Sequence, residues 1–251
     1  MDLITDTSPR QLARTAGALY LINIILGAFA LGVVPAILTV PDMATTAHNI
    51  QTHELLYRLG LAAHVVVILT NIPMAVIFYD LLKVVNRRLA LLDVLFSVVA
   101  TSVEAAGILN DATPSVLLGS SHYTNALPPA QLHALAYLPG ELSTFDYSLY
   151  GVLYGFDFIC VAYLVYKSTF LPRAIGVLLA IDALNYLISG FTGYLAPGVA
   201  AHLVPWNGLP TILAEGSLCL WLLVTGVDVE RWKEQASAAI RMRSTQLAEL
   251  S

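Results

Sequence analysis

The chain has 251 residues, of which 57% are hydrophobic and only 12% are charged, and its mean hydropathy is +0.74. A water-soluble protein of this size could not bury so much apolar surface, so the composition excludes most globular enzymes and indicates an integral membrane protein. The formal net charge is −5 and no basic stripe is present, which argues against nucleic acid as a partner.

Six apolar segments, each near or above the ~20 residues that a helix needs to cross a ~30 Å hydrocarbon core, follow one another along the chain. They lie near 16–40, 59–82, 89–110, 147–166, 174–197 and 207–227. The first is too long for the apolar part of a cleaved signal, so we expect it to be retained. The pattern predicts an all-α integral membrane protein, a six-transmembrane-helix bundle that forms a single domain over residues 1–251.

The distribution of Lys and Arg predicts how this bundle is oriented. Eleven of the twelve fall before the first segment, between the second and third, between the fourth and fifth, or after the sixth, and only Arg58 falls on the other side. Because short loops rich in Lys and Arg stay in the cytoplasm, both termini and the tail 228–251 are expected to be cytoplasmic. The long connection 111–146 is then an extracytoplasmic loop, with a short helical pattern from Pro129 to Leu138.

Polar residues recur at helical spacing within five of the six segments, so that each of these helices has a polar stripe. Ionisable groups inside a bilayer are costly unless they face the bundle interior, so we expect the stripes to converge on a common interior. The stripes are Tyr57, His64 and Asn71; Ser97, Thr101 and Glu104; Asp146, Tyr150, Tyr154 and Asp157; Asp182, Asn185, Tyr186 and Ser189; and Asn207, Thr211 and Glu215.

These stripes predict an acidic, Tyr-lined pocket within the membrane. Its candidate proton donors are Glu104, Glu215, Asp157 and Asp182, and its candidate substrate-binding residues are His64, Arg58, Asn71, Tyr150, Tyr154, Tyr186 and Asn185. Counting residues from the helix ends predicts that Glu104 and Glu215 face one another in the outer half, with His64 or Arg58 within reach. At least some of the carboxyl groups should hold a proton, because an apolar environment disfavours the ionised form.

A purely structural role competes with a functional one at several of these positions. His64 and Glu104 would also make an interhelical hydrogen bond that merely holds the bundle together. Asn71 could satisfy the backbone carbonyl that nearby Pro73 leaves free. Asp93 is expected to form a surface ion pair with Arg87 or Arg88, and Tyr20 to belong to the aromatic belt at the membrane surface.

Local catalytic signatures such as HExxH, a Walker loop or GxSxG do not occur in the chain. The six histidines match no standard zinc spacing, so we expect neither a metal nor a cofactor. The two cysteines fall inside predicted helices and are expected to be free.

Three segments carry a resemblance to a known family. They are YRLGLAAHVVVILTNIPMAVIFYDLLKVVNRRLALL, YGFDFICVAYLVYKSTFLPRAIGVLLAIDALNYLI and ILAEGSLCLWLLVTGV. Together they resemble the bacterial six-helix membrane family catalogued as domain of unknown function 4386, over about Ala13 to Val227. The resemblance implies the fold and a location in the cell inner membrane, and it implies no activity. His64 and Asp182 depart from the pattern of that family.

Two classes of function are open at this point. The first is an intramembrane enzyme that acts on a lipophilic small molecule, in which a protonated carboxyl group drives a cyclisation or isomerisation, by analogy with terpene cyclases. The second is a non-catalytic binder, carrier or accessory subunit that uses the carboxyl groups to bind a cation or relay protons. The enzyme is the first choice. The bilayer is a partner in either case, and the sequence leaves the oligomeric state open.

Overall fold

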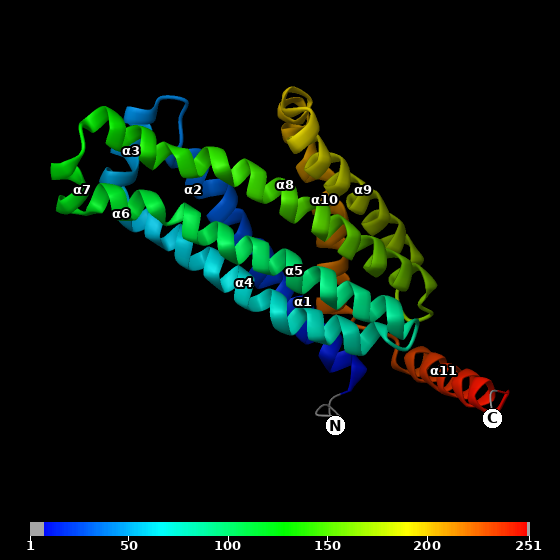
Figure 1. The fold of residues 1–251 in the computed structure, drawn as a ribbon. Coiled ribbons are helices and arrows are strands. Elements are labelled where there is room, and N and C mark those ends of the chain that lie inside the picture. The colour runs from blue at the N-terminus through cyan, green and yellow to red at the C-terminus, as the bar shows by residue number, and fades with distance from the viewer. Residues whose placement is uncertain (1–7, 250–251) are drawn as a thin grey trace.

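The computed structural model describes residues 8–249, and within them helices are joined by short turns (Figure 1). The termini proper, 1–7 and 250–251, lie outside the described residues, although the predicted cytoplasmic ends include them. The elements are α1 (Pro9–Gly27), the π-helical η1 (Ala28–Val33), α2 (Val34–Leu38), α3 (Met43–Thr52), α4 (Glu54–Leu82), α5 (Arg87–Asp111), α6 (Thr113–Gly119), α7 (Ser121–Ala126), α8 (Pro129–Lys167), α9 (Arg173–Leu195), α10 (Pro197–Val224) and α11 (Val229–Glu249).

Six helical segments of the described chain are long and apolar enough to cross a membrane, which confirms the predicted helical membrane bundle. They are Pro9–Leu38, Glu54–Leu82, Arg87–Gly119, Pro129–Lys167, Arg173–Leu195 and Trp206–Val224. Clear signals mark their ends. Ser8 and Gln11 form a capping box at the start of α1, and the Asn86 side chain accepts hydrogen bonds from the first backbone N–H groups of α5.

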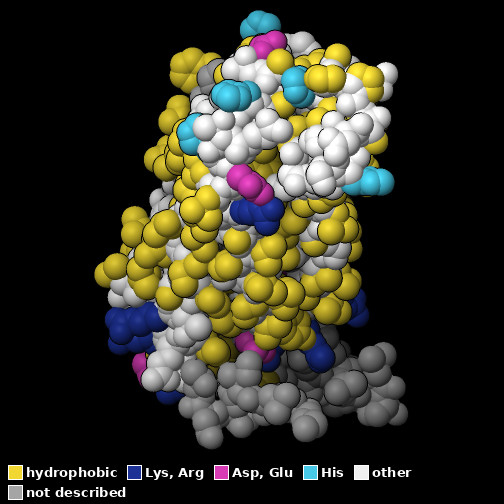
Figure 2. Space-filling model, turned by 90° about the vertical axis from the view of Figure 1, so that its left-hand side faces the viewer, with side chains coloured by type: hydrophobic (Ala, Val, Ile, Leu, Met, Phe, Trp, Pro, Cys, Tyr) yellow, Lys and Arg dark blue, Asp and Glu magenta, His cyan; other side chains and the backbone are white. Residues whose placement is uncertain are grey.

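The spanning helices pack as a ring that follows chain order. α1 contacts α4, α4 contacts α5, α5 contacts α8, α8 contacts α9, α9 contacts α10, and α10 returns to α1. Each helix therefore turns one face toward a shared interior, as the converging polar stripes predict. The other faces expose large apolar side chains such as Leu69, Leu95, Ile188 and Ile212. On the side of the molecule that Figure 2 shows, hydrophobic side chains form a broad band, which suits contact with the bilayer.

Glycines allow the closest approaches within this ring. A Cβ atom at Gly17 of α1 would lie 2.5 Å from the backbone nitrogen of Leu223 on α10, where the ring closes. A Cβ atom at Gly190 of α9 would lie 2.7 Å from the carbonyl oxygen of Ser148 on α8. Small residues at helix contacts are typical of membrane proteins, because packing rather than the hydrophobic effect holds their helices together.

The expected loop 111–146 is mostly helical, which corrects the predicted boundaries. α5 leads directly into α6, and the fourth spanning helix begins at Pro129 rather than near 147. The first part of α8 packs with α2, α3 and α6 through a separate apolar cluster that includes Leu38, Ile50, Leu118 and Leu132. Because this cluster buries the apolar side of each short helix, the segment forms a helical cap at one end of the ring (Figure 1).

Charge separates the two ends of the molecule. The start of α1, the α4–α5 and α8–α9 turns and α11 lie at one end, and the cap lies at the other (Figure 1). Lys and Arg gather toward the first end in Figure 2, whereas histidines gather at the cap. Within the cap, Asp42 begins α3, and hydrogen bonds from the Thr45 hydroxyl and backbone N–H hold the pKa of its carboxyl group below its usual value.

The tail forms a separate helix, α11, beyond a turn instead of extending the sixth spanning helix (Figure 1). α10 ends at Val224, and Gly226 has a φ of 72°, a left-handed conformation that suits glycine at the end of a helix. In α11, the Trp232 indole N–H donates to the carbonyl oxygen of Leu81 at 2.9 Å. The charged helix is therefore attached to the end of α4.

Candidate functional site

The centre of the ring holds a small cavity of about 30 Å³. Its lining comes from five of the six spanning helices: Tyr20 from α1, Asn71, Met74, Ala75 and Phe78 from α4, Asp93 and Ser97 from α5, Tyr154, Asp157, Phe158 and Val161 from α8, and Leu218 from α10. A cavity of this size has room for about two water molecules. The polar residues around it form four groups, each built on one buried carboxyl group or on a pair.

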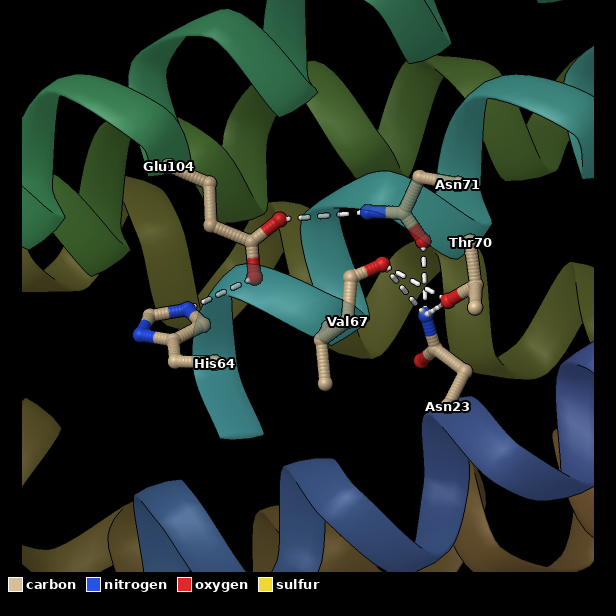
Figure 3. A network of polar contacts seen from close by, with 6 residues as sticks. All are labelled: Asn23, His64, Val67, Thr70, Asn71 and Glu104. Atoms are coloured by element: carbon tan, nitrogen blue, oxygen red, sulfur yellow. Dashed lines mark hydrogen bonds and ion pairs between the residues drawn. The ribbon is translucent and has the colours of Figure 1, made fainter. Parts of the chain in front are cut away.

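The first group is centred on Glu104 of α5, whose two carboxylate oxygens both have partners on α4 (Figure 3). His64 Nε2 lies 3.0 Å from Oε1, and the Asn71 amide donates to Oε2 at 3.2 Å. The side chains of His64 and Glu104 are 5% and 6% exposed. A carboxylate with both oxygens paired, one of them to a histidine, has its hydrogen-bonding capacity met inside the bundle.

The hydrogen bonds around Asn71 fix the orientation of its amide. The Thr70 hydroxyl donates to the carbonyl oxygen of Val67, so Thr70 Oγ1 is free to accept. The Asn23 Nδ2 atom of α1 lies 3.0 Å from Thr70 Oγ1 and 2.7 Å from Asn71 Oδ1. Because Asn71 accepts on its oxygen, its nitrogen faces Glu104 (Figure 3). Asn71 therefore links α1 and α5, rather than satisfying the carbonyl freed by Pro73.

The second group is centred on Glu215 of α10. The hydroxyl groups of Tyr20 and Tyr186 donate to its two oxygens, each at 2.8 Å. Tyr20 is only 2% exposed, so it belongs to the interior and not to the aromatic belt where we expected it. A tyrosine hydroxyl can donate to a carboxylate without adding charge, so this group is satisfied by hydrogen bonds alone.

The third group is Asp182 of α9, which is fully buried. Its Oδ1 accepts from the Thr211 hydroxyl at 2.8 Å and from the Asn185 amide at 3.4 Å. Asn185 also donates to the carbonyl oxygen of Asn207. Oδ2 of Asp182 has no hydrogen-bond partner among the described residues.

The fourth group is the pair Asp93 and Asp157, which are 3% and 4% exposed. Their carboxyl groups lie within hydrogen-bonding distance of each other across the α5–α8 contact. Because an ionised carboxylate cannot donate, one member of the pair carries a proton when this bond is made. The expected surface ion pair of Asp93 with Arg87 or Arg88 is therefore wrong.

Aromatic rings stand between these groups. The Tyr150 and Tyr154 rings stack with centroids 5.0 Å apart, and Tyr154 meets Tyr186 edge to face at 5.3 Å. Phe158 packs beside Tyr154, with centroids 4.6 Å apart. The three tyrosines predicted from the polar stripes thus form one cluster with Phe158.

A second and smaller cavity, of about 10 Å³, lies on the cap side of Glu104. Its lining is His64, Glu104, Gly107, Asp111, Ser143, Asp146, Tyr147 and Tyr150. The volume corresponds to about one water molecule. This cavity joins the Glu104 group to Asp111 and Asp146, which are only half-buried.

The structure places Glu104 and Glu215 in different groups, and it places Arg58 outside the site. Glu104 bonds with α4, whereas Glu215 bonds with tyrosines of α1 and α9, so the two do not form one shared pair. Arg58 pairs with Glu54 one turn earlier on α4, and both side chains are largely exposed. Arg58 is therefore not a cation of the bundle interior, because its long side chain lies on the exposed surface of the protein.

Asp93 and Asn23, like Tyr20, were not among the predicted site residues, and the sequence holds a signal for Asp93. Asp93 lies four residues before Ser97 and therefore extends the polar stripe of α5, although its distance from the helix start suggested a surface position. Asn23 lies in an otherwise apolar segment, where only Tyr20 precedes it at helical spacing. Among the described residues, no three His, Cys, Asp or Glu side chains gather in a way that would hold a metal ion.

Comparison with protein families gives one match, to the family described as Domain of unknown function (DUF4386), over residues 15–226. The chain belongs to this family. Comparison with curated proteins and with solved structures finds no match. Family membership and the six apolar helices together establish a multi-pass helical membrane protein, and the description of the family assigns it no activity.

Proposed function

We propose that this protein relays protons through the interior of its helix ring. The observation that carries the proposal is the placement of its buried titratable groups. His64, Glu104, Asp157 and Glu215 all lie on inward faces, and the carboxyl groups of Asp93 and Asp157 lie close enough to each other to share a proton. Ionisable residues held inside a membrane bundle at this cost are typical of ion and proton pathways.

The two cavities supply the connections between these groups. The smaller cavity joins Asp111 and Asp146 to His64 and Glu104, and Asn71 joins Glu104 to the central cavity. Asp93 and Asp157 also line the central cavity. Each cavity is the size of one or two water molecules, which is the scale at which water carries a proton between side chains. An isoprenoid would need a much larger space.

The distribution of charge supports an orientation for this relay. The end with the Lys- and Arg-rich turns would face the cytoplasm of the bacterial inner membrane, and the histidine-rich cap would face outward. Cysteine variants at Ser120, a half-buried residue of the cap, and at exposed Ser237 of α11 test it, because the native Cys160 and Cys219 are buried. An impermeant thiol reagent applied to intact cells should label S120C alone, and labelling of S237C alone would invert the orientation.

Proton flux tests the function directly. The purified protein is placed in liposomes that contain a pH-sensitive dye, and an electrical potential is imposed with K⁺ and valinomycin. We expect flux above that of protein-free liposomes, and a fall to the protein-free rate in Glu104→Gln and in Asp157→Asn. Glu54→Gln changes an exposed glutamate on the outer surface and should leave the flux unchanged. Equal flux in the parent and Glu104→Gln liposomes would refute the relay.

The aromatic cluster favours a second candidate function, acid–base catalysis on a lipophilic small molecule. Tyr154 and Phe158 line the same cavity as Asp157, and ring faces stabilise cationic intermediates. Glu104, Asp157, Asp182 or Glu215 would then be the proton donor, with Tyr150, Tyr154 and Tyr186 lining the substrate space.

The enzyme hypothesis is tested on bacterial lipid extracts incubated with the purified protein and analysed by mass spectrometry. It predicts a product that disappears in the Asp→Asn or Glu→Gln variant of the donor. If all four amide variants form the same product as the parent protein, the carboxyl groups are not the donor.

A further inference from the structure

The central cavity presents two carboxyl groups and an unused oxygen atom to the same small space. Asp93 and Asp157 lie within hydrogen-bonding distance of each other, yet Oδ1 of Asp157 has no hydrogen-bond partner among the described residues. Asp157 is 4% exposed and lines the cavity, so this oxygen cannot turn to bulk solvent. A buried carboxyl oxygen without a partner is costly, and it indicates that something else occupies its coordination.

The negative charge of this pair is also not balanced by a cationic side chain among the described residues that line the cavity. With one shared proton the pair has a net charge of about −1, and none of the twelve described residues that line the cavity is Lys, Arg or His. His64 is engaged with Glu104, and both oxygens of Glu215 are engaged with tyrosines. One further positive charge would therefore neutralise the pair. A second proton supplies that charge, and so does a monovalent cation.

The cavity has the donors that a small hard cation needs. Ser97 lies one helical turn after Asp93 on the same face of α5, and the oxygen-bearing side chains of Asn71, Tyr20 and Tyr154 also reach the lining. Hard cations are held by oxygen ligands, and the carboxyl, hydroxyl and amide oxygens of these residues are of that kind. The volume accommodates an ion of this size with about one water molecule, and not a hydrated divalent cation with its six ligands.

We propose that Asp93, Asp157 and Ser97 form a binding site for a sodium-sized monovalent cation, which competes with a proton for the carboxyl pair. The inference rests on the proposed relay, since it names the ion that exchanges with the relayed proton. Binding releases the second proton of the pair into the cavity, so that one positive charge leaves as another arrives. The other titratable groups that face the pair are Cys160 of α8, Glu215 of α10, Tyr154 and Tyr20.

The test is the thermal unfolding of the purified protein in detergent, with NaCl titrated against choline chloride at constant ionic strength. Binding to the folded state alone should raise Tm saturably with Na⁺. The apparent Na⁺ affinity should weaken by up to about tenfold for each unit by which the pH is lowered, because one proton is displaced by one cation. Asp157→Asn should abolish the effect, whereas Glu104→Gln, which removes an equally buried carboxylate in another group, should keep it.

Ser97→Ala keeps both carboxyl groups and should move the Na⁺ titration several-fold to higher concentration, so the site can be tested even if Asp157→Asn does not fold. An equal rise of Tm with choline, a rise with Mg²⁺ alone, or a Na⁺ effect that survives Asp157→Asn would overturn the proposal. The flux assay separates the two ideas. Na⁺ binding without proton flux would refute the relay and support the cation site. Proton flux without any effect of Na⁺ would refute the cation site and support the relay.

Discussion

Two buried carboxyl centres lie within one ring of helices, and they differ in the partners that their oxygen atoms have. Both oxygens of Glu104 have partners, one of them a histidine that can carry the balancing charge. Asp157 has a second carboxyl group as its partner and one oxygen with none among the described residues. Under the proposed relay, the Glu104 centre therefore holds its charge at rest, whereas the Asp93–Asp157 centre holds the exchangeable proton or ion.

The largest effect on stability should come from His64→Ala. The substitution leaves Glu104 buried with a single amide partner, and loss of one member of a buried ion pair costs about 3–5 kcal/mol. The free energy of unfolding in detergent should fall by that amount. His48→Ala provides the control, because His48 is exposed on α3 and its loss should cost under about 0.5 kcal/mol. Similar stabilities of the two variants would show that the Glu104 centre holds no charge.

Asn71→Ala should have the next largest effect. It removes the donor to Glu104 and the acceptor of Asn23, and an unsatisfied buried group costs about 1–3 kcal/mol. The loss of unfolding free energy in the double variant Asn23→Ala/Asn71→Ala should be smaller than the sum of the two single losses, because the second change removes a partner that is already lost. Strict additivity of the two single variants would show that the amide chain is not one network.

Asp157→Asn should be much milder than His64→Ala. The amide keeps the shape of the side chain, can donate to Asp93, and removes one of two carboxyl groups that lie against each other. We expect a change of about 1 kcal/mol or less in the unfolding free energy, in either direction. A loss as large as that of His64→Ala would mean that Asp157 is a structural anchor and that the two centres do not differ.

Arg58→Gln should have the smallest effect of these substitutions on the free energy of unfolding. Its partner Glu54 lies one turn away on the same helix, and both side chains are largely exposed. Exposed pairs of this kind contribute about 0.3–0.5 kcal/mol. A greater loss of unfolding free energy would place Arg58 in the interior after all.

The periodic features of the sequence predict much of this fold and part of this site. Apolar segments of sufficient length predict the six spanning helices, and the seven-residue spacing of His64 and Asn71 brings both to Glu104. Depth along a helix can be counted in residues, but its rotation depends on neighbouring helices. The depth of Asp93, near the start of its helix, suggested a surface position, although its place one turn before Ser97 puts it on the inward face.

Other features depend on contacts between distant parts of the chain. The cap is stabilised where α2, α3 and α6 meet the first part of α8, and no single segment carries that signal. The partnership of Tyr20 with Glu215 joins residues 195 positions apart. The sequence showed which helices have polar faces, and only the three-dimensional structure shows which carboxyl group meets which partner.

Infrared spectroscopy of the carboxyl groups tests the difference between the two centres most directly. At neutral pH, the parent protein should show the C=O stretching band of a protonated carboxyl group, and this band should shift on transfer to D₂O. We expect the part of the band that comes from the shared proton to be missing in Asp93→Asn/Asp157→Asn and to persist in Glu104→Gln. If the band is lost only in Glu104→Gln, the exchangeable proton is on Glu104, which contradicts the assignment of proton exchange to the Asp93–Asp157 centre.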